Sequence, residues 1–117
     1  MSLREEIERR HAGLPPPCVS TSKSPQSLSV RPANGERWSL DWARFVQARL
    51  GSGEDELTLI FAESEVVVHG RHLAIIMDSV DAREVERLRE YPPEYQALAD
   101  TMEPVITTLD VRARPRP

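Results

Sequence analysis

A two-residue alternation of apolar and polar side chains runs through the middle of the chain, and it limits the fold more than any other feature. It starts at Leu28 and Val30, which alternate with serines, and it continues with short interruptions to Gly70. Side chains of a strand point alternately to the two faces of a sheet, so this pattern predicts strands with one buried face. Asn34-Gly35, between two such runs, is the strongest short signal for a hairpin. We therefore expect about five short strands in an antiparallel meander.

The spacing of apolar residues lengthens after the alternating region and favours helices. Residues 73–80 carry one apolar stripe of a helix, and Asp81 has the features of an N-cap for a second helix that follows directly. A further short helix is expected over residues 95–102. Residues 105–111 return to alternation, which predicts one last strand.

These patterns together predict an α+β domain over residues 27–112. Its sheet would be the antiparallel meander, curled into a half-barrel or roll, followed by the helices and a final closing strand. An open sheet is the alternative shape. Residues 113–117 are expected to form a disordered tail. The residues expected to share one core are Trp38, Leu40, Trp42, Leu57, Leu59, Phe61, Ile76, Leu88 and Leu109.

Residues 1–26 have a different character from the rest of the chain. Residues 2–11 combine a capping-box start with i,i+4 charge pairs, which indicates a short helix. Residues 13–26 contain three consecutive prolines and a run of serines, and they indicate a linker. The pattern leaves open whether the helix docks on its own domain or on another chain. Its apolar residues, which need a surface to dock on, are Leu3, Ile7 and Leu14.

Composition and charge exclude several classes of function. The formal net charge is −4, whereas nucleic-acid-binding domains usually carry a strong basic bias, so nucleic acid is not the expected partner. No apolar run approaches the roughly 20 residues that cross a bilayer, so no membrane partner is expected. The single cysteine, Cys18, fits a reducing cytoplasm. Arginine far outnumbers lysine, which is typical of GC-rich coding and favours a bacterial source.

The sequence contains no motif for catalysis or for a cofactor. It has no Gly-x-Ser-x-Gly elbow and no glycine-rich phosphate loop, so no catalytic residue and no cofactor are predicted. His69 and His72 have a spacing that could hold a metal on one turn of a helix. Gly70 separates them at an expected strand-to-helix junction, and a zinc site needs further ligands, so no metal site is predicted.

Two functions remain. The first is a small non-enzymatic domain that binds another protein or itself. The residues expected to carry that contact are Leu3, Ile7 and Leu14 of the first helix and, if their strand is a sheet edge, Val66, Val67 and Val68. The alternative is a small-ligand or nucleotide-binding module, conceivably an enzyme, that uses an exposed sheet face. The residues expected to serve that alternative are Arg37, Arg49 and His69.

Overall fold

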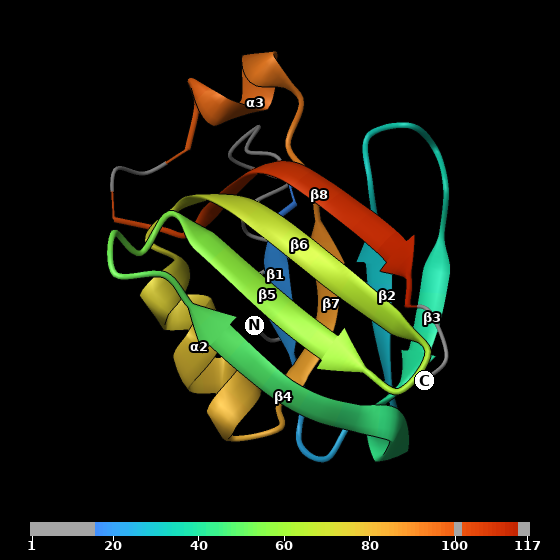
Figure 1. The fold of residues 1–117 in the computed structure, drawn as a ribbon. Helices are drawn as coiled ribbons and strands as arrows, with labels where there is room; N and C mark the ends of the chain where they lie inside the picture. Colours follow the sequence, from blue (N-terminus) through green and yellow to red (C-terminus); the bar gives the residue numbers. More distant parts are fainter. Residues whose placement is uncertain (1–15, 100–101, 115–117) are drawn as a thin grey trace.

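The computed structural model describes residues 16–99 and 102–114. Within these residues, eight strands form two four-stranded sheets that pack face to face, and helix α2 contacts both sheets at one end (Figure 1). The prediction of an α+β domain with a single meander is therefore wrong. The elements are β1 (Val19–Thr21), β2 (Ser27–Arg31), β3 (Trp38–Asp41), the 3₁₀ turn η1 (Trp42–Arg44), β4 (Phe45–Leu50), β5 (Glu56–Phe61), β6 (Ser64–Arg71), α2 (Leu73–Asp81), β7 (Val85–Arg89), α3 (Pro93–Gln96) and β8 (Val105–Ala113).

The strands form two separate sheets, whereas the sequence predicted one continuous meander. Sheet A has the order β1-β7-β2-β3, and sheet B has the order β4-β5-β6-β8. The expected hairpin at Asn34-Gly35 joins β2 to β3, and β4, β5 and β6 follow one another as expected. The chain leaves sheet A after β3 and returns to it only at β7, which pairs in parallel with β2.

The core lies between the inner faces of the two sheets. Sheet B contributes the alternate residues of β5 and β6, sheet A contributes those of β2 and β7, and α2 covers one end. All these side chains are apolar, as the alternation requires. The fully buried ones are Leu28, Val30, Leu57, Leu59, Val66, Val68, Leu73, Ile76, Val80, Val85, Leu88, Tyr91, Val105 and Ile106. Trp38, expected in the core, is instead 37% exposed at the edge of sheet A.

Strand β7 occupies the place where the sequence predicted a second helix. Helix α2 ends in a Schellman motif, in which Glu84 N–H donates to the Ser79 carbonyl and Arg83 N–H donates to the Val80 carbonyl. Arg83 has the left-handed conformation (φ 56) that usually calls for glycine. Its guanidinium lies 4.2 Å from the Phe45 ring centroid, and this contact helps to hold the residue there.

A β-bulge explains why the apolar spacing of this strand resembles that of a helix. Val85 and Leu88 are three residues apart, and both are fully buried. In the pairing with β1, Ser20 faces Arg87 and the next residue faces Val85, so Glu86 is the extra residue of a bulge. A bulge shifts the alternation by one position, which returns Val85 and Leu88 to the same face.

Part of the expected linker over residues 13–26 is a strand that packs on the domain. Residues 19–21 form β1 on sheet A, and Cys18 is buried in the core, where its sulfur accepts from the Ile106 N–H at 3.3 Å. The buried Tyr91 donates its hydroxyl to the Pro16 carbonyl, which fixes the chain before β1. The expected helix over residues 2–11, with Leu3, Ile7 and Leu14, lies outside the described residues.

Gly70 allows a backbone contact that any other residue would block. A bulge between His69 and Gly70 brings β6 so close to β8 that a Cβ at position 70 would lie 1.8 Å from the Val105 carbonyl oxygen. We expect Gly70→Ala to lower the free energy of unfolding by about 3 kcal/mol or more, because the strands must separate. Urea titration measures this loss, with Gly51→Ala as the matched control.

The control is informative because a Cβ at Gly51 would meet only the Glu56 carbonyl oxygen, at an ordinary 3.6 Å. It should change the free energy of unfolding by less than about 1 kcal/mol. Equal effects of the two substitutions would show that the contact with Val105 does not limit position 70.

The buried thiol predicts a pH dependence of stability. Burial raises the pKa of Cys18 from 9.0 to about 12, against a smaller opposing effect of the Ile106 N–H hydrogen bond. Between these values the unfolded chain has lost this proton and the folded chain keeps it, so stability falls as pH rises. The loss should be about 1.4 kcal/mol per pH unit above about pH 9. Urea titrations of the native chain and of Cys18→Ala measure it as the difference in slope, and parallel slopes would contradict it.

Candidate functional site

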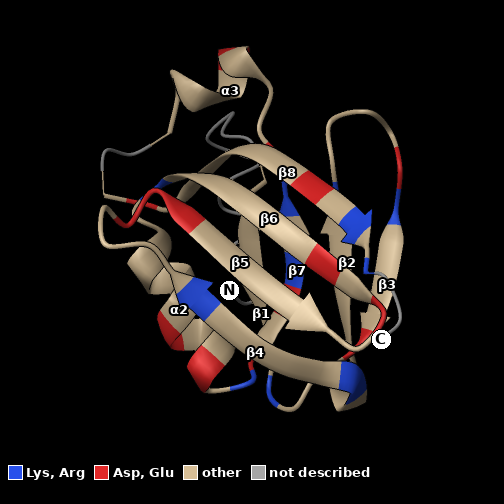
Figure 2. Cartoon of the chain, viewed as in Figure 1, with Lys and Arg blue, Asp and Glu red and all other residues tan. Residues whose placement is uncertain are grey.

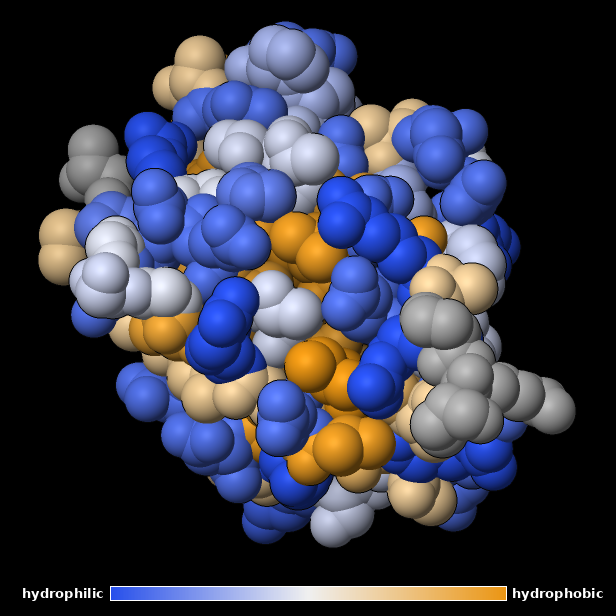
Figure 3. Space-filling view, viewed as in Figure 1, coloured by the Kyte–Doolittle hydropathy of each residue, from blue (hydrophilic) through white to orange (hydrophobic). Residues whose placement is uncertain are grey.

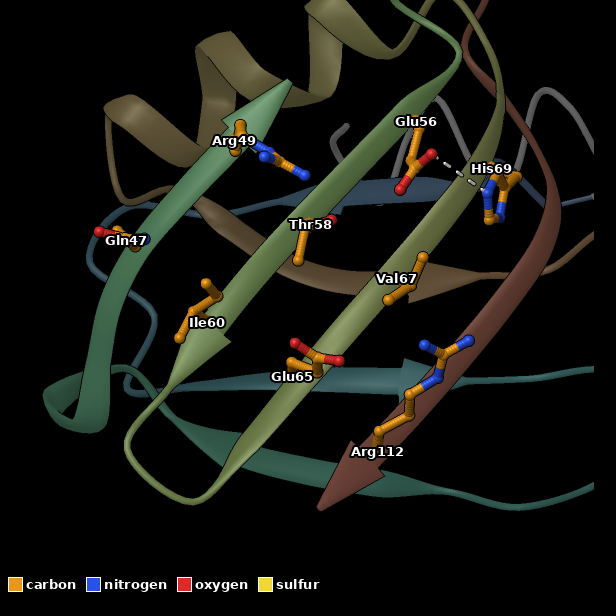
Figure 4. A pocket seen from close by; sticks show the side chains of 9 residues that line it. All are labelled: Gln47, Arg49, Glu56, Thr58, Ile60, Glu65, Val67, His69 and Arg112. Carbon is orange, nitrogen blue, oxygen red and sulfur yellow. Dashed lines mark ion pairs between the residues drawn. The ribbon is translucent and has the colours of Figure 1, made fainter. Parts of the chain in front are cut away.

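The outer face of sheet B carries a shallow depression. Its volume is about 410 Å³. Four strands contribute to it, so it crosses the whole sheet (Figure 4). The lining residues are Gln47 and Arg49 on β4, Glu56, Thr58 and Ile60 on β5, Glu65, Val67 and His69 on β6, and Arg112 on β8.

The floor of the depression is apolar. Thr58, Ile60 and Val67 alternate with buried core residues, so their side chains point away from the core, and strand pairing places Thr58 directly beside Val67. Val67 is only 8% exposed because the side chains around it cover it. Figure 3 shows this face with apolar side chains along the middle and hydrophilic ones on both sides. A partner would therefore meet a strip of apolar surface between polar borders.

The border of the depression carries charges of both signs. His69 Nε2 lies 3.6 Å from Glu56 Oε2, across the β5–β6 pair. Arg112 Nε donates to Asp110 Oδ2 at 2.8 Å, and this hydrogen bond and the charge of Asp110 raise the pKa of Arg112. Glu65 lies beside Arg112 in the β6–β8 register. These side chains form a polar border of nearly balanced charge.

The structure brings together two of the three residues expected to bind a small ligand. Arg49 and His69 both line the depression. Arg37 lies elsewhere, immediately before β3 of sheet A. These three residues therefore do not form one site, and Arg37 cannot contact a ligand that Arg49 and His69 bind.

Of the three consecutive valines of β6, Val66 to Val68, only Val67 lines the depression. Strand β6 lies between β5 and β8, so it is not the sheet edge on which the expectation for this run depended. Val66 and Val68 point into the core, and Val67 points outward into the floor. Sequence reasoning did not single out Ile60, Glu65 or Arg112 as site residues. Ile60 lies between the buried Leu59 and Phe61, and this alternation marks it as outward-facing.

Metal ligands do not gather in the part of the chain that the structure describes. No group of three histidine, cysteine, aspartate or glutamate side chains comes together there. His69 faces the depression, whereas His72 precedes α2 in a left-handed conformation (φ 56). No helix among the described residues is long and apolar enough to span a membrane.

Comparison with known proteins adds no family to this picture. No family model, no curated protein and no solved structure matches the chain. Function therefore has to be argued from the site itself.

The ion pair at the border should contribute little to folding. The side chains of His69 and Glu56 are about half exposed, at 47% and 49%, and exposed pairs are worth about 1 kcal/mol or less. We expect a double-mutant cycle with His69→Gln and Glu56→Gln to give a coupling below about 1 kcal/mol in urea titrations. A coupling above about 2 kcal/mol would instead make the pair a structural element of sheet B.

Proposed function

We propose that this chain is a small non-enzymatic interaction domain that binds protein through the outer face of sheet B. The observation that carries the proposal is the depression of about 410 Å³, with an apolar floor of Ile60 and Val67 inside a border of charged side chains. Apolar surface within a polar rim is the usual composition of a protein-binding surface. The contact therefore lies on the sheet face rather than on an edge strand.

The shape of the depression favours a protein surface over a small enclosed ligand. Its lining residues all lie on strands of sheet B, and Figure 4 shows how their side chains are spread across that sheet. Small-molecule sites usually enclose most of the ligand surface. An open sheet face instead provides a broad contact surface, which suits a second protein of complementary shape.

The occupant that we expect is a second copy of this chain. The border combines Arg49 and Arg112 with Glu56 and Glu65, so two copies of the face can oppose each other without a net repulsion. A two-fold interface uses the same patch on both subunits, so the charges of that patch must be able to face their own copies, as a patch of mixed sign can. Four strands spaced by about 4.8 Å give a narrow contact, so we expect association of the weak, transient class.

The test is the concentration dependence of molecular mass. Size-exclusion chromatography with light scattering, from about 10 to 500 µM, should show the mass of the native chain rising toward that of a dimer. Ile60→Lys should remain monomeric because it places a charge on the apolar floor. The matched control is Ile75→Lys, at a position on α2 that is 45% exposed and outside the depression.

The control should associate as the native chain does, and both variants should melt near the native temperature. Two results would overturn the proposal. One is a native chain that stays monomeric over the whole range. The other is an Ile60→Lys variant that is folded and dimerises with unchanged affinity.

A further inference from the structure

Four arginines gather on the outer face of sheet A, away from the depression. They are Arg31, Arg37, Arg87 and Arg89, and they are called the arginine cluster below. Arg87 and Arg89 flank the buried Leu88 on β7, so both point away from the core. Arg31, at the end of β2, lies directly beside Arg89 in the parallel register. Arg37 immediately precedes β3, the other neighbour of β2. Figure 2 shows basic positions on β7 and at the start of β3.

No arginine of the cluster forms an ion pair with another described residue. Ion pairs in this part of the chain involve other side chains, such as Arg44 with Glu63 and Arg112 with Asp110. Partial burial lowers the pKa of Arg31, and the positive charges of its three arginine neighbours lower it further. These charges therefore repel one another within sheet A.

One guanidinium in the cluster also has an unused donor. Arg87 Nε is buried and has no hydrogen-bond partner among the residues that the structure describes. A buried donor without a partner and like charges directly opposite on neighbouring strands are both destabilising. A bound anion would remove the repulsion, because it would neutralise the charges and accept hydrogen bonds from the guanidinium groups.

Short hydroxyl side chains lie beside Arg87 on both neighbouring strands. Ser20 on β1 and Ser29 on β2 are its direct neighbours in the register, and Ser39 on β3 lies beside Ser29. Arg31 Nε lies 3.4 Å from Ser29 Oγ. The surface above this row is therefore bounded by guanidinium groups and lined by hydroxyl donors, both of which bind phosphate oxygens.

We propose that the arginine cluster binds a small anion with two linked phosphate groups, of the diphosphate class present in nucleotides. Arginines on three strands about 4.8 Å apart span roughly 10 Å, which suits two phosphates side by side better than one. A diphosphate also carries several charges in a small volume, whereas a carboxylate would neutralise only one of the four arginines. An acidic peptide, which spreads its charges along a chain, is the alternative that the experiment separates.

Calorimetric titration with inorganic pyrophosphate tests the proposal on the full chain. At a constant ionic strength of about 0.1 M, which screens general attraction, pyrophosphate should bind with a stoichiometry of one. Arg89→Gln should weaken this binding by about tenfold or more, because it removes a charged hydrogen-bond donor. Arg71→Gln is the matched control, at an exposed position at the end of β6 that lies outside both the arginine cluster and the depression. It should leave the dissociation constant within about twofold.

Thermal melting without added anion separates a binding role from a structural one. Arg89→Gln should then melt at least as high as the native chain, because the substitution relieves the repulsion with Arg31. The proposal is overturned if the native chain gives no saturable binding, or if Arg89→Gln and Arg71→Gln bind pyrophosphate equally. It is also overturned if a glutamate-rich peptide binds more tightly than pyrophosphate, or if Arg89→Gln alone melts several degrees lower. The outcome is independent of the dimer contact, which lies on the other sheet.

Discussion

The burial of Trp42 at the corner between the two sheets is the contact on which the rest of the structure depends. Trp42 lies in η1, where the chain passes from sheet A to sheet B, and its indole N–H donates to the Val85 carbonyl at 2.9 Å. Its ring centroid lies 5.1 Å from that of Phe45 and 5.6 Å from that of Phe61, at the ends of two sheet B strands. One side chain thus joins both sheets, and aromatic contacts of this kind add to the stability of the buried area.

The two-sheet arrangement also determines where function can lie. The inner faces are occupied by the core, so the two outer faces and the strand edges remain for binding. The outer face of sheet B is apolar in the middle and of mixed charge at its border, which suits a protein surface. The outer face of sheet A carries the arginine cluster and hydroxyl side chains, which suits a small anion. The two outer faces of this small domain thus differ in kind: one is apolar with a charged border, and the other is basic with hydroxyl side chains.

The sequence predicted individual strands better than it predicted their arrangement. Alternation located the strands between Leu28 and Gly70 and the last strand, which was expected over residues 105–111 and is β8 (Val105–Ala113), because one buried face imposes a period of two. It failed at β7, where a bulge gives Val85 and Leu88 a helix-like spacing. It also failed at the end of α2, because Arg83 takes the position where glycine would have signalled a stop. Both failures come from contacts with distant residues, which override local preference.

The sequence by itself indicated which side chains turn outward where the alternation is regular, as on β2 and β5, since alternation depends only on neighbouring residues. It thus indicated that Arg49 and His69 could share an exposed face, and strand pairing within the β4–β5–β6 meander placed them there. Only the tertiary structure decided that Arg37 belongs to a different face and that Arg31 lies beside Arg89. That neighbourhood depends on the parallel pairing of β2 with β7, two strands separated by most of sheet B. No local pattern encodes such a pairing, because it is selected by burial of the shared core after the chain has folded back on itself.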